Sequence, residues 1–123
     1  MERNPEITKY KPDDGKEPFD IWFNKLKDKR AKAKILIRLK RVERVERVER
    51  VERVERVELG NFGDSKSLGE GVYELRVTEG QAYRVYYGLK DNKLVLLLCG
   101  GNKSMQKKDI KLAKQYWSNY NAE

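Results

Sequence analysis

Hydrophobic positions near the N-terminus predict a short strand followed by a helix. Ile7 to Tyr10 alternate between apolar and polar residues like a strand and stop at the turn signal Pro-Asp-Asp-Gly at 12–15. A helix is expected to begin at Pro18, a residue that suits the first helical position. Apolar residues then recur at helical spacing, at Phe19, Trp22, Phe23 and Leu26. We expect these four side chains to lie in the core.

A second helix is predicted to run into a tract of six Arg-Val-Glu triplets, from Arg41 to Glu58. Ala31, Ile35 and Leu39 fall on one helical face just before the tract. A strand is unfavourable because valines three residues apart would alternate between its faces. In a helix, by contrast, glutamates meet arginines four residues later, which is the favourable order. The sequence therefore predicts one helix from about Ala31 to Glu58, roughly 42 Å long, with Gly60 as its C-terminal cap.

The C-terminal half predicts a sheet and a last helix. Three strands are expected at Val72 to Thr78, Ala82 to Gly88 and Lys93 to Cys99, joined by turns at Gly80 and Asp91-Asn92. Ser104 is the expected N-cap of a helix with one apolar face, formed by Ile110, Ala113, Trp117 and Tyr120. The prediction is a single α+β domain over residues 1–123, with a small antiparallel sheet flanked by helices in the order β-α-α-β-β-β-α. The tract, 41–58, is then an insertion that divides the domain into 1–40 and 59–123.

Charge points to a phosphate-rich partner. The net charge is +8, and the tract contributes six arginines and six glutamates, so the excess lies in the rest of the chain. Nucleic acid is the first candidate and an anionic membrane the second. The alternative is that the basic surface only keeps the protein soluble and binds no specific partner. No apolar stretch reaches 18 residues and no signal-peptide pattern begins the chain, so a cytoplasmic protein is expected.

Metal and redox chemistry find little support in the composition. Histidine is absent and Cys99 is the single cysteine, which argues against a zinc site, and no cofactor is expected. Cys99 lies in an apolar run, where a buried structural thiol is the expectation rather than a reactive one.

Candidate chemistry gathers on the predicted hairpin. If its loop is Glu79 to Gln81, Arg76 lies directly opposite Arg84, and Tyr86 shares their face. Opposed like charges are destabilising unless an anion bridges them, and guanidinium groups match phosphate oxygens in pairs. The alternative is that Arg76 pairs with Glu74 or another carboxylate. Lys66 and Lys103 would extend such a cationic site.

The tyrosines of the hairpin divide by parity along the strand. Tyr83 and Tyr87 are expected in the core, because they point to the face opposite Tyr86. Tyr86 itself is the tyrosine that could stack on a nucleic-acid base.

An ordered run of motifs follows the tract. The motifs are Leu59-Gly60-Asn61-Phe62-Gly63-Asp64, Gly69-Glu70-Gly71-Val72, Glu74-Leu75-Arg76, Tyr83-Arg84-Val85-Tyr86, and Leu97 through Gly100-Gly101 and Lys103-Ser104 to Asp109-Ile110. This run resembles the addiction-module killer proteins of the RelE/HigB toxin superfamily. The resemblance implies a toxin of a type II toxin–antitoxin system that cuts mRNA on the ribosome and is inhibited by a cognate antitoxin. It assigns catalytic or RNA-contacting positions to Arg76, Arg84, Tyr86 and Lys103. Lys66, Lys107 and Lys108 are further RNA-binding candidates. One branch of the superfamily poisons DNA gyrase instead, so the target stays open.

The chemistry available to such an enzyme is metal-independent endoribonuclease chemistry. Without histidine, and with tyrosine and lysine pKa values ordinarily near 10, catalysis would depend on positioning and on charge stabilisation by Arg76 and Arg84. Lys103 or Tyr86 would serve at best as proton donor.

The tract departs from the family pattern and supports a different prediction. About one triplet would normally join the second helix to the Leu-Gly-Asn turn, so the extra residues favour an exchanged homodimer, in which residues 1–40 of one chain complete the sheet of another. The alternative function is then a helix-extended, catalytically impaired or engineered scaffold. A DNA-operator repressor is a third interpretation, which only the basic charge favours.

Overall fold

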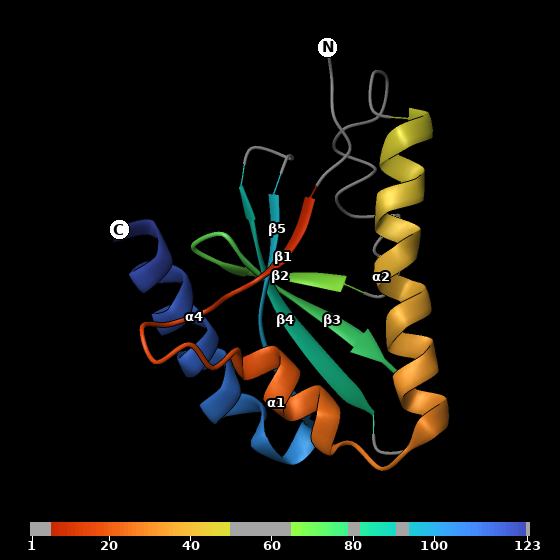
Figure 1. Ribbon diagram of the computed structural model, residues 1–123, viewed down its shortest axis with the longest axis horizontal. Coiled ribbons are helices and arrows are strands. Elements are labelled where there is room, and N and C mark those ends of the chain that lie inside the picture. The colour runs from red at the N-terminus through yellow and green to blue at the C-terminus, as the bar shows by residue number, and fades with distance from the viewer. Residues whose placement is uncertain (1–5, 50–64, 79–81, 91–93, 123) are drawn as a thin grey trace.

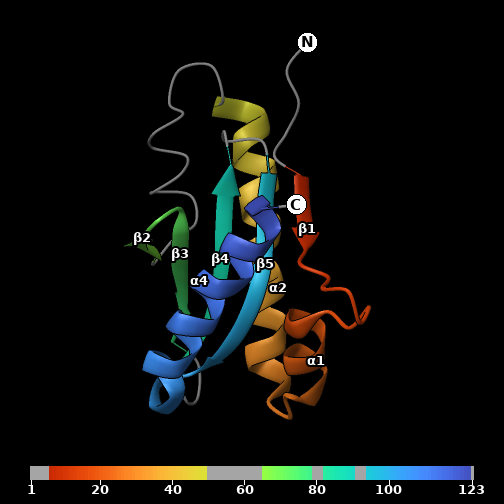
Figure 2. The same cartoon turned by 90° about the vertical axis from the view of Figure 1, so that its left-hand side faces the viewer.

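A five-stranded sheet lies between two layers of helices in the computed structural model, which describes residues 6–49, 65–78, 82–90 and 94–122 (Figure 1). The strands are β1 (Glu6–Lys9), β2 (Ser65–Gly69), β3 (Val72–Val77), β4 (Tyr83–Lys90) and β5 (Leu94–Asn102). The helices are α1 (Pro18–Lys25), α2 (Lys29–Glu49) and α4 (Gln106–Ala122), and the 3₁₀ helix η1 (Lys103–Met105) joins β5 to α4. Figure 2 shows α4 on one face of the sheet and the other two helices on the opposite face. The predicted α+β class is confirmed.

The sheet is mixed rather than purely antiparallel. Its strand order is β1-β5-β4-β3-β2, with β1 parallel to β5 and the other pairs antiparallel. The three predicted C-terminal strands and their antiparallel pairing are confirmed, but β4 continues to Lys90 and β5 to Asn102 instead of ending at Gly88 and Cys99. Strand β2 was not predicted, because Ser65, Lys66 and Ser67 give no alternation of apolar and polar residues. Such a polar strand suits the edge position that β2 occupies.

Strand β1 pairs with the sheet of its own chain. Ile7 lies opposite Val95, and the amide of Tyr10 donates to the carbonyl of Leu97 at 2.9 Å. This parallel pairing satisfies the backbone of β1 without a second copy. The prediction that residues 1–40 complete the sheet of another chain is therefore wrong for this structure.

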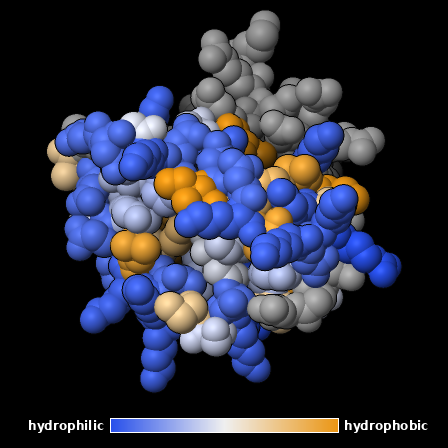
Figure 3. Space-filling model, turned by 60° about the horizontal axis from the view of Figure 1, so that its bottom comes forward, coloured by the Kyte–Doolittle hydropathy of each residue, from blue (hydrophilic) through white to orange (hydrophobic). Residues whose placement is uncertain are grey.

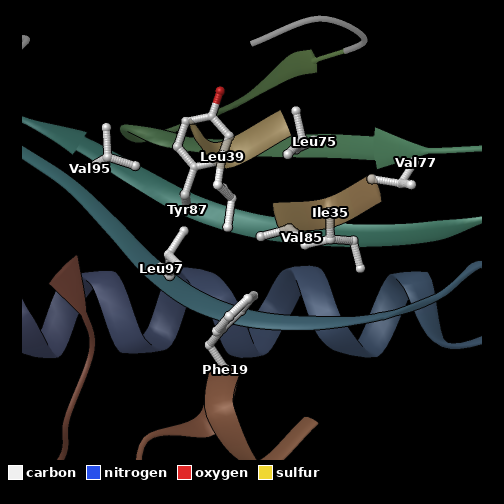
Figure 4. Packing of buried hydrophobic residues seen from close by; sticks show 9 residues of the cluster. All are labelled: Phe19, Ile35, Leu39, Leu75, Val77, Val85, Tyr87, Val95 and Leu97. Carbon is white, nitrogen blue, oxygen red and sulfur yellow. The ribbon is translucent and has the colours of Figure 1, made fainter. Parts of the chain in front are cut away.

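One core lies between the sheet and the pair α1 and α2. Figure 4 shows its nine buried side chains, which are Phe19, Ile35, Leu39, Leu75, Val77, Val85, Tyr87, Val95 and Leu97. Trp22, Phe23 and Leu26 pack against this cluster while partly buried, so the predicted apolar face of α1 is confirmed. Tyr83 and Tyr87 are buried as predicted.

A second core lies beneath α4. It contains Tyr86, Leu98, Cys99, Ala113 and Trp117, with Ile110 and Tyr120 partly buried at its border, which confirms the predicted face of the last helix. The thiol of Cys99 is buried, and burial, helped by the nearby charge of Asp109, raises its pKa to about 12. It is therefore the structural cysteine that the sequence predicts.

The close approach of α4 to the sheet depends on glycine. A Cβ atom at Gly88 would lie 2.1 Å from a ring carbon of Trp117, so only a residue without a side chain fits there. Trp117 therefore lies flat against the strand, and α4 keeps a fixed position over β4.

The helix termini differ in part from the sequence prediction. α2 begins at Lys29, and the carboxylate of Asp28 accepts a hydrogen bond from the amide of Ala31 at 3.0 Å. The helix is described to Glu49, while the rest of the predicted helix to Glu58, and its cap at Gly60, lie outside the described residues. Ser104 is not the N-cap of α4, because η1 comes first and the side chain of Asn102 accepts from the amide of Ser104 at 3.1 Å. Asparagine caps as well as serine does.

Candidate nucleic-acid interface

Two arginines face each other where β3 ends and β4 begins, at the lower end of the sheet in Figure 1. Arg76 lies directly opposite Arg84 in the antiparallel register, which confirms the pairing predicted from the loop length. Their strand positions alternate with Leu75 and Val85 of the first core, so both side chains belong to the face that α4 covers. Arg38 of α2 donates to the carbonyl of Arg76 at 2.8 Å, which fixes the end of β3 from the other face.

A buried carboxylate accompanies the arginine pair. Glu74 is 0% exposed and Arg84 is 7% exposed, and Glu74 Oε2 lies 3.4 Å from Arg84 Nε. The guanidinium is held a second time, because Arg84 Nη1 donates to the carbonyl of Ala82 at 3.2 Å. The sequence offered Glu74 as a partner of Arg76, and the structure places it against Arg84.

The same carboxylate reaches the start of α4. Gln106 Nε2 donates to Glu74 Oε2 at 2.8 Å, so Glu74 connects β3 both to β4 and to the first residue of the helix. Neither Glu74 nor Gln106 was a predicted site residue. Strand parity was the available signal for Glu74, since it lies two positions before Arg76 and thus on the same face.

Tyr86 is directly opposite Glu74 in the β3–β4 register and is completely buried. Among the described residues, none forms a hydrogen bond of normal geometry with its hydroxyl. Burial raises its pKa far above the ordinary value, and the charges of Glu74 and Asp109 add to that increase. The phenol therefore stays protonated at neutral pH, and its ring offers no exposed surface. The predicted stacking of a base on Tyr86 is wrong for this structure.

The predicted lysines lie around this cluster and are exposed. Lys66 on β2 is opposite Glu74 in the β2–β3 register. Lys103 is on η1, and Lys107 and Lys108 are in the first turn of α4. Figure 3 brings the lower end of the molecule forward and shows a mostly hydrophilic surface with extended polar side chains. The structure thus brings the lysines of η1 and α4 to the face that carries the two arginines.

Asp109 packs against the last strand beside the cluster. A Cβ atom at Gly101 would lie 2.0 Å from Asp109 Oδ2, so the glycine is what admits this carboxylate. That oxygen is buried and has no hydrogen-bond partner in the part of the chain that the structure describes. Burial raises the pKa of Asp109, while the neighbouring charge of Lys108 opposes the increase.

The raised pKa of Asp109 predicts a pH dependence of stability. The folded protein holds this proton more tightly than the unfolded chain, so the stabilising contribution is present at low pH and is lost as the pH rises from about 4 through the folded pKa. Asp109→Asn is expected to remove that loss, so the variant should match or exceed the native chain in unfolding free energy at pH 7. Urea unfolding of both proteins between pH 3.5 and 7 measures it. A steeper fall with pH in the variant would contradict the assignment.

Two classes of site find no support among the described residues. Residues 6–49, 65–78, 82–90 and 94–122 contain no group of three or more cysteine, aspartate or glutamate side chains arranged to hold a metal ion. In the same part of the chain, no helix has the length and apolar character needed to cross a membrane.

Comparisons with known proteins agree with a single family over most of the chain. A protein from Haemophilus influenzae, described as uncharacterized, is 51% identical over 96 residues, which cover 78% of this chain and 82% of the relative. No solved structure matches significantly. The family model of the phage-derived Gp49-like proteins (DUF891) matches residues 21–118, which include both arginines, Glu74 and the lysines of η1 and α4. The chain therefore belongs to the Gp49-like family, a toxin-like family of toxin–antitoxin systems.

Proposed function

We propose that this chain is the toxin of a type II toxin–antitoxin system and cleaves mRNA on the ribosome without a metal ion. The observation that carries the proposal is the opposition of Arg76 and Arg84 on one face of the sheet. Guanidinium groups from two directly opposed strand positions suit the oxygens of one phosphodiester. Membership of a toxin-like family supports the biological role and the expected antitoxin partner.

In this mechanism the arginines stabilise the charge that develops on the phosphate. Arg84 Nη1 donates to the carbonyl of Ala82, whereas Nε lies 3.4 Å from Glu74 Oε2 without a hydrogen bond to it, so Nη2 is the nitrogen that neither contact uses. Lys103 would protonate the leaving oxygen from η1. Tyr86 would not contact the RNA. Its neutral hydroxyl would pack beneath the arginine pair, opposite Glu74. Lys66, Lys107 and Lys108 would bind the flanking RNA backbone, where lysines act as point charges.

The proposed site residues include no side chain that is a good general base at neutral pH. Histidine is absent from the chain, and the buried phenol of Tyr86 is held in its protonated form. Free RNA should therefore be cut slowly, because activation of the ribose 2′-OH then depends on geometry that the ribosome supplies. Dependence on translation is thus an expected property of the site.

The experiment compares translated and free mRNA. Induction of the protein should stop growth, and in a translating extract the message should be cut, whereas purified RNA alone should stay intact over the same time. Primer extension locates the cuts. Intact mRNA together with accumulated relaxed or cleaved plasmid would favour gyrase as the target instead.

The tract favours a second candidate, a helix-extended protein without toxin activity. The six triplets have no counterpart in the motif pattern, and α2 includes them at least as far as Glu49. If the induced protein is soluble and folded while growth and mRNA stay unchanged, this second candidate is the better account. Shortening the tract to one triplet would then show whether the expansion caused the loss.

A further inference from the structure

We propose that Glu74 is a positioning residue, which sets both the guanidinium of Arg84 and the Lys103-bearing turn for RNA cleavage. The inference rests on the proposed function for its catalytic part. Its structural part, the orientation of Arg84 and η1 by one buried carboxylate, can be measured without any activity.

The position of Glu74 is costly for a carboxylate. Its side chain is completely buried, and no described residue forms a hydrogen bond with its Oε1 atom. A buried ion pair of this kind contributes little net stability, and apolar residues of similar size often stabilise a fold equally well. Stability alone therefore gives a weak reason for a carboxylate at this point. Orientation of a charged neighbour gives a stronger one.

The contacts of Glu74 link the two parts of the proposed catalytic group. Through Oε2 it attracts Arg84 Nε at 3.4 Å and accepts from Gln106 Nε2 at 2.8 Å. Gln106 directly follows η1, which carries Lys103. One oxygen atom thus connects the phosphate-binding arginine with the turn that holds the proposed proton donor.

The ion pair also accounts for the close arrangement of arginines. Arg76 and Arg84 are directly opposite each other, an arrangement that is destabilising for like charges. Glu74 supplies a negative charge on the same face, and so allows the pair to form before RNA binds. The distance of 3.4 Å exceeds that of a tight charge-assisted hydrogen bond. Glu74 therefore holds Arg84 mainly by charge and leaves it able to contact a phosphate.

Glu74→Gln tests the proposal because it keeps the shape and removes the charge. The variant gains one unit of positive charge, so its affinity for a single-stranded RNA should be unchanged or up to about threefold higher. Its cleavage rate on translated mRNA should fall at least about tenfold, because the guanidinium and the η1 turn are no longer aligned. A merely structural role would lower binding and cleavage together, in proportion to the folded fraction.

Gln106→Leu separates the two contacts of Glu74, since it removes the contact with Gln106 next to η1 and leaves the contact with Arg84. Cleavage should fall while the Arg84 Nε–Hε signal in ¹H–¹⁵N spectra stays protected from exchange with water. In Glu74→Gln that signal should lose its protection. The signal is assigned by its loss in Arg84→Lys. The matched control is Glu70→Gln, which alters an exposed carboxylate 3.5 Å from Lys114.

The outcomes separate this proposal from the proposed function. Absence of cleavage by the native chain would refute the function, while the exchange of the Arg84 signal would still decide whether Glu74 orients it. The positioning role is overturned if Glu74→Gln keeps that protection, or if it cleaves within about threefold of the native rate. It is equally overturned if binding and cleavage fall by the same factor.

Discussion

Glu74→Leu is expected to lower the free energy of unfolding by about 3 to 5 kcal/mol, because it leaves the buried charge of Arg84 without a counter-charge. The side chain of Arg84 is 9% exposed, so water can replace little of the lost interaction. The amide of Gln106 loses its acceptor in the same step. For a domain of 123 residues, a loss of this size is a large part of the total stability.

A matched substitution and a double variant check the cause. Glu70→Leu removes a carboxylate whose side chain is 74% exposed and 3.5 Å from Lys114, and it should cost about 1 kcal/mol or less. Replacing Glu74 and Arg84 together by leucine should recover most of the stability, since no unpaired charge remains. Urea unfolding of the four proteins measures both effects. A single Glu74→Leu variant within about 1 kcal/mol of the native chain would show that the ion pair does not bear on folding.

The sequence predicted those parts of the fold that depend on the spacing of nearby residues along the chain. Helical spacing at Phe19, Trp22 and Phe23 identified the apolar face of α1. The assumption of a three-residue loop was enough to place Arg76 opposite Arg84, because loop length sets the register of a hairpin. Both predictions depended on neighbours in sequence.

Parts that depend on distant contacts were missed or wrong. Strand β2 has no apolar alternation, and only the adjacent edge of β3 makes it a strand. The parallel pairing of β1 with β5 could be satisfied within one chain or by exchange, since the contacts are the same in both cases. The burial of Glu74 also needs tertiary structure, because it follows from α4 lying over that face with Gln106 in reach.

Arg84→Ala is expected to slow cleavage of translated mRNA by about 10²- to 10³-fold, the usual effect of removing one preorganised donor from a developing charge. Arg84→Lys keeps the charge and a partner for Glu74 but loses the paired geometry of the guanidinium. Its rate should lie between those of the alanine variant and the native chain. RNA affinity should change far less in the lysine variant than the rate does.

Lys90→Ala is the matched control for charge, since Lys90 is exposed at the opposite end of β4 and donates a long hydrogen bond of 3.5 Å to Asn121. It removes the same positive charge, so both alanine variants should lose similar long-range attraction for RNA. Rates are compared at a temperature where circular dichroism shows every variant folded, because Arg84→Ala also leaves Glu74 unpaired. If Arg84→Ala slows cleavage no more than Lys90→Ala does, Arg84 contributes only general charge. The phosphate would then have to bind elsewhere than between the two opposed arginines.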